Sequence, residues 1–104
     1  MNKNYCIDSV MEIIKNIPSG KVTTYGAIGK TLKISPRLVG RILHQNPDPS
    51  IYSCHRVVRS DGTIAVGYAF GGKDGQIKKL ISEGIEIKNG RVCNMKIFIW
   101  LSDY

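Results

Sequence analysis

Apolar residues at helical spacing organise the first part of the chain. An amphipathic helix that ends before residues 18–20 is predicted by the stripe Cys6, Val10, Ile13, Ile14 and Ile17. A second helix follows, with Thr23 or Thr24 as its N-cap, and runs to Leu32. A third begins after a very short connection, so the two helices together predict a helix-turn-helix.

The third predicted helix has the clearest start in the chain. Ser35 suits the N-cap, and Pro36 suits the first helical position, where a missing N–H group loses no hydrogen bond. One face of this helix is cationic around a bare glycine, which permits close approach of a partner. That face consists of Arg37, Gly40, Arg41 and His44. An ordinary exposed face with a tolerated glycine has the same pattern.

Turns and short elements dominate the rest of the chain. Residues 46–50 must turn, and we expect the segment Ile51–Val58 that follows them to be extended. Ser60-Asp61-Gly62 predicts the tip of a wing-like hairpin, and residues 67–72 predict a flexible loop.

A fourth helix through Ile77, Leu80 and Ile81 should end at Gly84. Asn89-Gly90 predicts a second hairpin, and residues 96–101 are either a buried strand or an exposed edge strand. The fold class we predict is mainly α with short β-hairpins, a winged helix-turn-helix-like single domain over residues 1–104.

Charge narrows the choice of partner. The net charge is +7, and the segment Gly20–Arg59 holds seven basic residues against one acidic residue. Such a balance favours a polyanion such as nucleic acid, although many basic domains simply have solvated lysines. No signal peptide or apolar run of spanning length is present, so we expect no membrane association and a cytoplasmic protein, or a nuclear one in a eukaryote.

Cysteine usage points to a nucleophile rather than to a structural site. The three cysteines have no paired spacing, so we expect neither a disulfide framework nor a bound metal. Cys6 and Cys93 fall in a core stripe and a strand, where cysteine is usually a small buried residue. Cys54 is followed by His55, and a neighbouring imidazole activates a thiol. In an extended segment the two side chains point apart, so contact between the thiol and the imidazole requires a bend or a bridging water.

Glu83 is the candidate third member of this site. A carboxylate commonly orients a basic imidazole, and a glutamate in the last turn of a helix opposes the helix dipole unless a cation or histidine compensates. A solvated surface glutamate is the alternative. His44 is a phosphate neighbour or a plain surface residue.

The segment Ser53-Cys54-His55-Arg56-Val57-Val58 resembles the Pro-Cys-His-Arg-Val motif of the O6-alkylguanine-DNA alkyltransferases. Further matches lie in the family's order and at nearly its spacing, and together they cover about residues 5–92. They are Gly20-Lys21-Val22-Thr23-Thr24-Tyr25, Arg37 with Val39-Gly40, Asn46-Pro47, Gly67-Tyr68 and Leu80-Ile81-Ser82-Glu83-Gly84. Residues 93–104 form an extra tail.

The resemblance implies a role for each matching residue. Cys54 would accept the alkyl group, through His55 and a water that are activated by Glu83, while Tyr25 would protonate the departing guanine. The guanine edge would be read by main chain near Cys54 and Val57 and by Tyr68 and Ala69. Arg37 would fill the place of the flipped nucleotide, Gly40 would meet the minor groove beside Arg41, and Asn46 would support the active-site segment.

The resemblance also sets the function that we expect and its alternative. The expected partner is double-stranded DNA containing O6-alkylguanine, and the protein would act as a monomer without a cofactor in one irreversible transfer. Ser53 replaces the family's proline, and Gln76 stands where many members have lysine. The alternative is an alkyltransferase-like damage sensor that binds the lesion and recruits nucleotide-excision-repair proteins. A winged-helix regulator and a cysteine hydrolase are the remaining hypotheses for the function.

Overall fold

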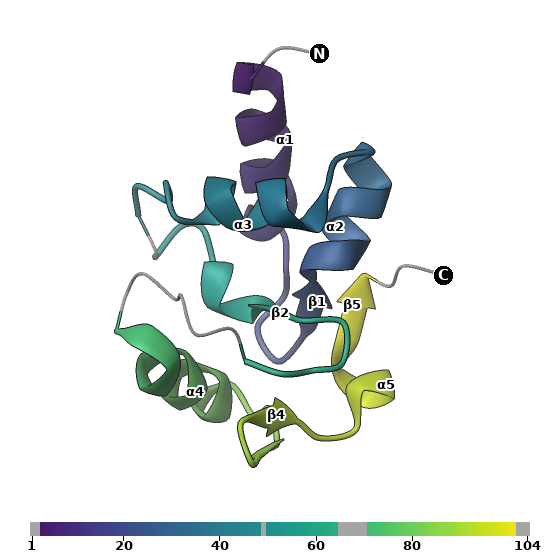
Figure 1. The fold of residues 1–104 in the computed structure, drawn as a ribbon. Coiled ribbons are helices and arrows are strands. Elements are labelled where there is room, and N and C mark those ends of the chain that lie inside the picture. The colour runs from purple at the N-terminus through teal and green to yellow at the C-terminus, as the bar shows by residue number, and fades with distance from the viewer. Residues whose placement is uncertain (1–2, 49, 65–70, 102–104) are drawn as a thin grey trace.

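Three helices form the upper part of the molecule in Figure 1. The computed structural model describes residues 3–48, 50–64 and 71–101. Helices α1 (Lys3–Lys15), α2 (Tyr25–Leu32) and α3 (Pro36–Leu43) enclose a shared apolar core. The main buried members of that core are Val10, Ile14, Ile17, Ile28, Val39, Ile42, Leu43 and Val57.

The N-caps that begin α2 and α3 confirm the predicted helix-turn-helix. Thr24 Oγ1 accepts a hydrogen bond from the Ala27 N–H at 3.0 Å, and Ser35 Oγ accepts one from the Leu38 N–H at 3.1 Å. The connection between the two helices passes closely over Gly29, where a Cβ atom would lie 2.6 Å from the main-chain oxygen of Ile34 and 3.3 Å from the nitrogen of Pro36. Glycine is therefore required at this position of α2.

A parallel sheet lies in the middle of the molecule, which the sequence did not predict (Figure 1). Strand β1 (Val22–Thr24) lies between β2 (Val57–Val58) and β5 (Ile99–Leu101) and is parallel to both. Thr23 pairs with Val57 and Thr24 with Val58. All three residues of β1 are buried, as expected of a parallel strand covered on both faces. The fold is thus mainly helical with short strands, as predicted, but not all of them form hairpins.

The segment Ile51–Val58 is not extended throughout, which corrects the prediction. Residues Cys54–Arg56 form a single 3₁₀ turn, η1, before β2 begins. The Arg56 N–H donates to the Ser53 carbonyl at 2.9 Å, and the Val57 N–H donates to the Cys54 carbonyl. The chain bends at the predicted nucleophile, so adjacent side chains are not forced onto opposite faces.

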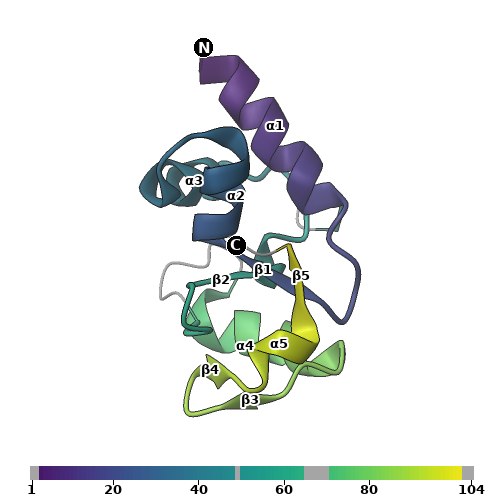
Figure 2. The ribbon, with the colours of Figure 1, turned by 90° about the vertical axis from the view of Figure 1, so that its right-hand side faces the viewer.

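A second apolar core lies below the sheet, beside α4 (Gly72–Ser82) (Figure 2). Gly84, at φ +89°, ends this helix as predicted. The predicted hairpin also forms, with β3 (Ile87–Lys88) antiparallel to β4 (Arg91–Val92). Asn89 and Gly90 both have positive φ, as the two central residues of a tight hairpin turn require.

The predicted wing differs in its pairing. The Gly62 N–H donates to the Arg59 carbonyl at 2.8 Å, so the turn at residues 60–62 is present. Thr63 then pairs with Arg91 of the second hairpin, and the Ile64 N–H donates to the Gly90 carbonyl at 2.9 Å. The segment after the turn therefore joins the lower layer of the molecule, which consists of α4, the β3–β4 hairpin and the second apolar core.

The C-terminal segment is a helical turn followed by an edge strand, not a buried strand. Helix α5 (Met95–Phe98) precedes β5, and Lys21 Nζ donates to the Ile97 carbonyl at 2.9 Å. Ile97 is 62 % exposed and Trp100 is 39 % exposed. Cys93 lies after β4 and is half-buried, which corrects its assignment to a buried strand. The side chain of Cys6 lies outside the described residues.

Candidate active site

Asn46 connects the end of α3 to the turn that carries Cys54. Its Nδ2 donates to the Tyr52 carbonyl at 2.8 Å and to Cys54 Sγ at 3.2 Å, and its Oδ1 accepts from the Asp48 N–H at 2.9 Å. The amide is buried, at 7 % exposure, and so is Cys54. The sulfur is thereby held by a side chain that reaches it from the helix-turn-helix.

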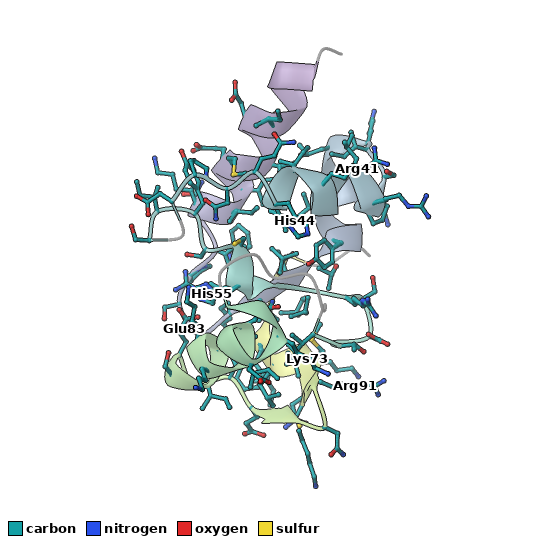
Figure 3. All side chains as sticks on the ribbon, turned by 60° about the vertical axis from the view of Figure 1, so that its left-hand side comes forward. Arg41, His44, His55, Lys73, Glu83 and Arg91 are labelled. Atoms are coloured by element: carbon teal, nitrogen blue, oxygen red, sulfur yellow. The ribbon has the colours of Figure 1, made fainter. Side chains whose placement is uncertain are left out.

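His55 and Glu83 are brought together across 28 residues of sequence, and Figure 3 shows them side by side. His55 Nε2 lies 3.0 Å from Glu83 Oε2. The carboxylate belongs to the C-cap of α4, directly after Ser82, where it opposes the helix dipole. Its predicted partner is therefore in place, and the surface alternative for Glu83 does not describe this side chain.

Arg56 is a further member of the site that the sequence analysis missed. Its Nε donates to Glu83 Oε1 at 2.9 Å, and one of its terminal nitrogens contacts the other carboxylate oxygen. The remaining terminal nitrogen donates to the Ile17 carbonyl at 2.8 Å and to Ser53 Oγ at 3.0 Å. The signal was available, since a glutamate at a helix C-terminus favours a cation as well as a histidine.

Burial keeps the cysteine and histidine neutral at rest. It raises the pKa of the Cys54 thiol, an effect that the Asn46 hydrogen bond and the Lys79 charge only partly offset. It lowers the pKa of His55 despite the opposing influence of Glu83. Burial alone would raise the pKa of Glu83, but hydrogen bonds from Arg56 and His55 outweigh it and lower that pKa.

These protonation states assign the tautomer of the imidazole. An ionised Glu83 accepts the proton on His55 Nε2, so a neutral His55 keeps its lone pair on Nδ1. Nδ1 is buried, and it has no hydrogen-bond partner among the described residues. The arrangement therefore leaves Nδ1 free to act as a base, on the residue that follows Cys54 in sequence.

Tyr25, the first residue of α2, faces the same region. Its pKa is raised, first by burial and then by the nearby Cys54, while Arg59 acts in the opposite direction. The phenol therefore stays protonated at neutral pH and can donate a hydrogen bond. Its ring also lies under Gly40, where an added Cβ would be 4.0 Å from Tyr25 Cε1.

The cationic residues of α3 lie on the surface. Arg37, Arg41 and His44 are exposed, and Figure 3 shows Arg41 and His44 on α3, above the turn that carries His55. Gly40 is half-buried, and the fold does not require a glycine there. Val57 is buried, and Tyr68 and Ala69 lie outside the described residues.

In the part of the chain that the structure describes, no group of three or more His, Cys, Asp or Glu side chains is placed to hold a metal ion. Within the same residues no helix is long and apolar enough to cross a membrane.

The family model for the DNA-binding domain of 6-O-methylguanine DNA methyltransferase matches residues 6–85. The chain belongs to this family. The methylated-DNA–protein-cysteine methyltransferase of Methanocaldococcus jannaschii is 48 % identical over 62 residues, which are 60 % of this chain and 36 % of that relative. The chain thus spans about a third of the length of that methyltransferase.

Two solved structures of the alkyltransferase family and its relatives share the fold. S. pombe Atl1 in complex with damaged DNA containing O6-carboxymethylguanine superposes with a TM-score of 0.83 at 31 % identity, over 96 % of this chain and 98 % of Atl1. The O6-methylguanine-DNA methyltransferase from Pyrococcus kodakaraensis has a TM-score of 0.65 at 39 % identity, over 76 % of this chain and 46 % of that enzyme.

Proposed function

We propose that the chain is a DNA repair protein that takes the alkyl group from O6-alkylguanine in duplex DNA onto Cys54, in one irreversible turnover. The observation that carries the proposal is the His55–Glu83 contact of 3.0 Å beside the cysteine turn. It engages Nε2 and leaves Nδ1 as an acceptor for the thiol proton. Membership of the family and the named activity of its methyltransferases support the substrate class.

The proposed reaction is a displacement at the alkyl carbon. Cys54 Sγ forms a bond to that carbon while the bond from the carbon to guanine O6 breaks, and the thiol proton passes through a bridging water to His55 Nδ1. The electron pair of the broken bond goes to guanine, which takes a proton from the Tyr25 hydroxyl as it departs. Solvent then returns the imidazolium proton to the tyrosine. Cysteine is nucleophile and final acceptor, so no cofactor enters the balance.

Access to the lesion requires DNA binding and base flipping. Exposed Arg41 would contact phosphates, and Arg37 would occupy the place of the extruded nucleotide, because flipping costs a few kcal/mol. Gly40 would let the backbone of α3 approach the minor groove. The Val57 main chain, together with Tyr68 and Ala69, would read the guanine edge. The likeness to Atl1, whose structure holds damaged DNA containing O6-carboxymethylguanine, supports binding to such DNA.

A damage sensor is the second candidate, and two observations favour it. Burial raises the pKa of Cys54, so the thiol is weakly nucleophilic at rest, and the similarity to Atl1 covers nearly that whole protein. A sensor would hold the flipped base and recruit nucleotide-excision-repair proteins instead of repairing the base itself.

Mass measurement of the intact protein after incubation with O6-methylguanine DNA separates the two functions. Transfer adds one methyl group per chain, and Cys54→Ser abolishes the gain. Tight binding to the damaged duplex without a mass change supports the sensor. Equal affinity for damaged and undamaged duplexes of one sequence, without a mass change, would contradict both and leave the winged-helix regulator.

A further inference from the structure

Gln76 is a polar side chain in the interior of the lower layer, on the side of α4 that faces the cysteine turn. It is 1 % exposed. Its Nε2 donates to the His55 carbonyl at 2.9 Å and to the Val57 carbonyl at 3.1 Å. One amide group thus bridges two main-chain oxygens that lie on either side of Arg56, where η1 ends and β2 begins.

A second amide holds the other end of the same segment. Asn46 binds the Tyr52 carbonyl and Cys54 Sγ, at 2.8 and 3.2 Å, from the end of α3. Figure 1 shows α3 above and α4 below the turn that leads into β2, so the two amides reach it from opposite layers. Between Tyr52 and Val57 they bind three carbonyls and the sulfur.

The bonding of Gln76 is not that of a residue selected for stability alone. Its Oε1 is buried, and it has no hydrogen-bond partner among the described residues. Burying such a group opposes folding, and an apolar side chain of similar size would avoid that penalty. Local departures from good packing chemistry concentrate at functional sites, where geometry is held at a cost in stability. The geometry held here is that of the main chain on both sides of Arg56.

We propose that Gln76 is a positioning residue for alkyl transfer, through its two hydrogen bonds to the main chain of the cysteine turn. These bonds fix where His55 and Val57 lie, and therefore the direction in which the neighbouring thiol and imidazole point. The inference rests on the proposed transferase function. It concerns the geometry of the turn and not its proton transfers, since an amide does not titrate.

Three variants of Gln76 test the proposal against Ile85→Val, a mild change in the same lower core. Gln76→Met keeps length and removes both donors. Gln76→Lys keeps the reach and restores N–H donors. Gln76→Asn keeps the amide but is one methylene shorter, so it replaces Gln76→Met as the test if the methionine variant does not fold. Each protein is assayed for the single-turnover rate constant at saturating O6-methylguanine duplex and for the Kd of an undamaged duplex.

We expect Gln76→Met to lower the rate constant about tenfold, which corresponds to about 1.4 kcal/mol. The Kd for undamaged DNA should stay within about twofold, because α3 is untouched. Gln76→Lys should recover most of the rate, and Gln76→Asn should fall between. The loss should be the same factor at every pH. A Gln76→Met protein that transfers methyl at the rate of Ile85→Val overturns the inference and leaves the transferase function intact.

Hydrogen exchange separates this inference from the proposed function. If the unsubstituted protein transfers no methyl, the transferase proposal fails, and exchange at the Arg56 and Val57 amides then decides about Gln76. Exchange about tenfold faster in Gln76→Met than in Ile85→Val supports the positioning role. Equal exchange in these two variants overturns it.

Discussion

Replacing Glu83 by glutamine removes one negative charge from the point where three interactions meet. The carboxylate accepts from His55 Nε2 at 3.0 Å, from Arg56 Nε at 2.9 Å and from a second nitrogen of Arg56. A glutamine amide has one acceptor oxygen, and its NH2 group would face a donor. At least one of the three hydrogen bonds is therefore lost in Glu83→Gln.

The size of the effect follows from burial. The side chains of Arg56 and Glu83 are each 14 % exposed, and that of His55 is 8 % exposed. Hydrogen bonds to charged groups contribute about 1.5–3 kcal/mol each, and unpairing a buried charge costs about 3–5 kcal/mol. Since some solvent reaches the site, we expect Glu83→Gln to lower the free energy of unfolding by about 3 kcal/mol. The transfer rate should fall about 10²-fold, because His55 loses the partner that sets its tautomer.

Urea unfolding and single-turnover transfer measure the two effects, with Glu86→Gln as the matched control. Glu86 is exposed and should change stability by less than about 0.5 kcal/mol. The pKa of Glu83 is lowered from 4.5, so its stabilisation is present above that pH and is lost as pH falls through the lower folded value. The difference in free energy of unfolding between Glu83→Gln and the unsubstituted protein should therefore shrink in acid. Glu83→Gln within about 1 kcal/mol of the unsubstituted protein at pH 7 would refute this reasoning.

Three further predictions test other parts of the site. The transfer rate should decline only below pH 6.5, because the pKa of His55 is lowered. It should stay flat between pH 7 and 9, because neutral His55 accepts the thiol proton during the reaction; a reaction through free thiolate would rise about tenfold per pH unit there, since the pKa of Cys54 is raised from 9.0, and single-turnover rates across this range would reveal such a rise. Asn46→Ala removes three hydrogen bonds and should lower the free energy of unfolding by about 2–3 kcal/mol in urea. Gly29→Ala should cost about 3 kcal/mol through its contact with main chain, whereas Gly40→Ala should gain about 0.5–1 kcal/mol yet weaken duplex binding. Thermal melts and a DNA titration compare the two variants. Unchanged duplex affinity in Gly40→Ala would contradict the close approach of DNA to α3 at this position.

Local signals explain the parts of the fold that could be predicted. Thr24 and Ser35 act as N-caps within three residues of the N–H groups they bind, and Asn89-Gly90 needs only its own dihedral angles. Each helix or hairpin that carries such a signal was predicted in the right place. The His55–Glu83 pair was also predicted, because an unfavourable dipole position called for a partner and the family resemblance supplied one.

Contacts between distant segments explain what was missed. Strand β1 has three residues and pairs with β2 and β5, which lie over thirty and over seventy residues away, so no local pattern marks it. The 3₁₀ turn at Cys54 depends on Asn46 and Gln76, whose side chains reach it from two helical layers. A glutamine within a helix carries no sign that its amide will be buried against another segment's carbonyls.

The electrostatics of the site suit the proposed single transfer to Cys54. A single alkylation of Cys54, by any electrophile, would end the function of the chain, so a reactive resting thiolate would be wasteful. Burial raises the pKa of this thiol, and the imidazole beside it is neutral, so the resting pair carries no charge. In the proposed reaction, Cys54 would become nucleophilic only as a base accepts its proton. Glu83 orients His55 through Nε2, so that Nδ1 is available to accept the thiol proton. The resting sulfur needs no charge for this. In the proposed reaction, selectivity for the lesion would arise from alignment of the alkyl carbon, thiol and imidazole, and Asn46 and Gln76 would secure that alignment.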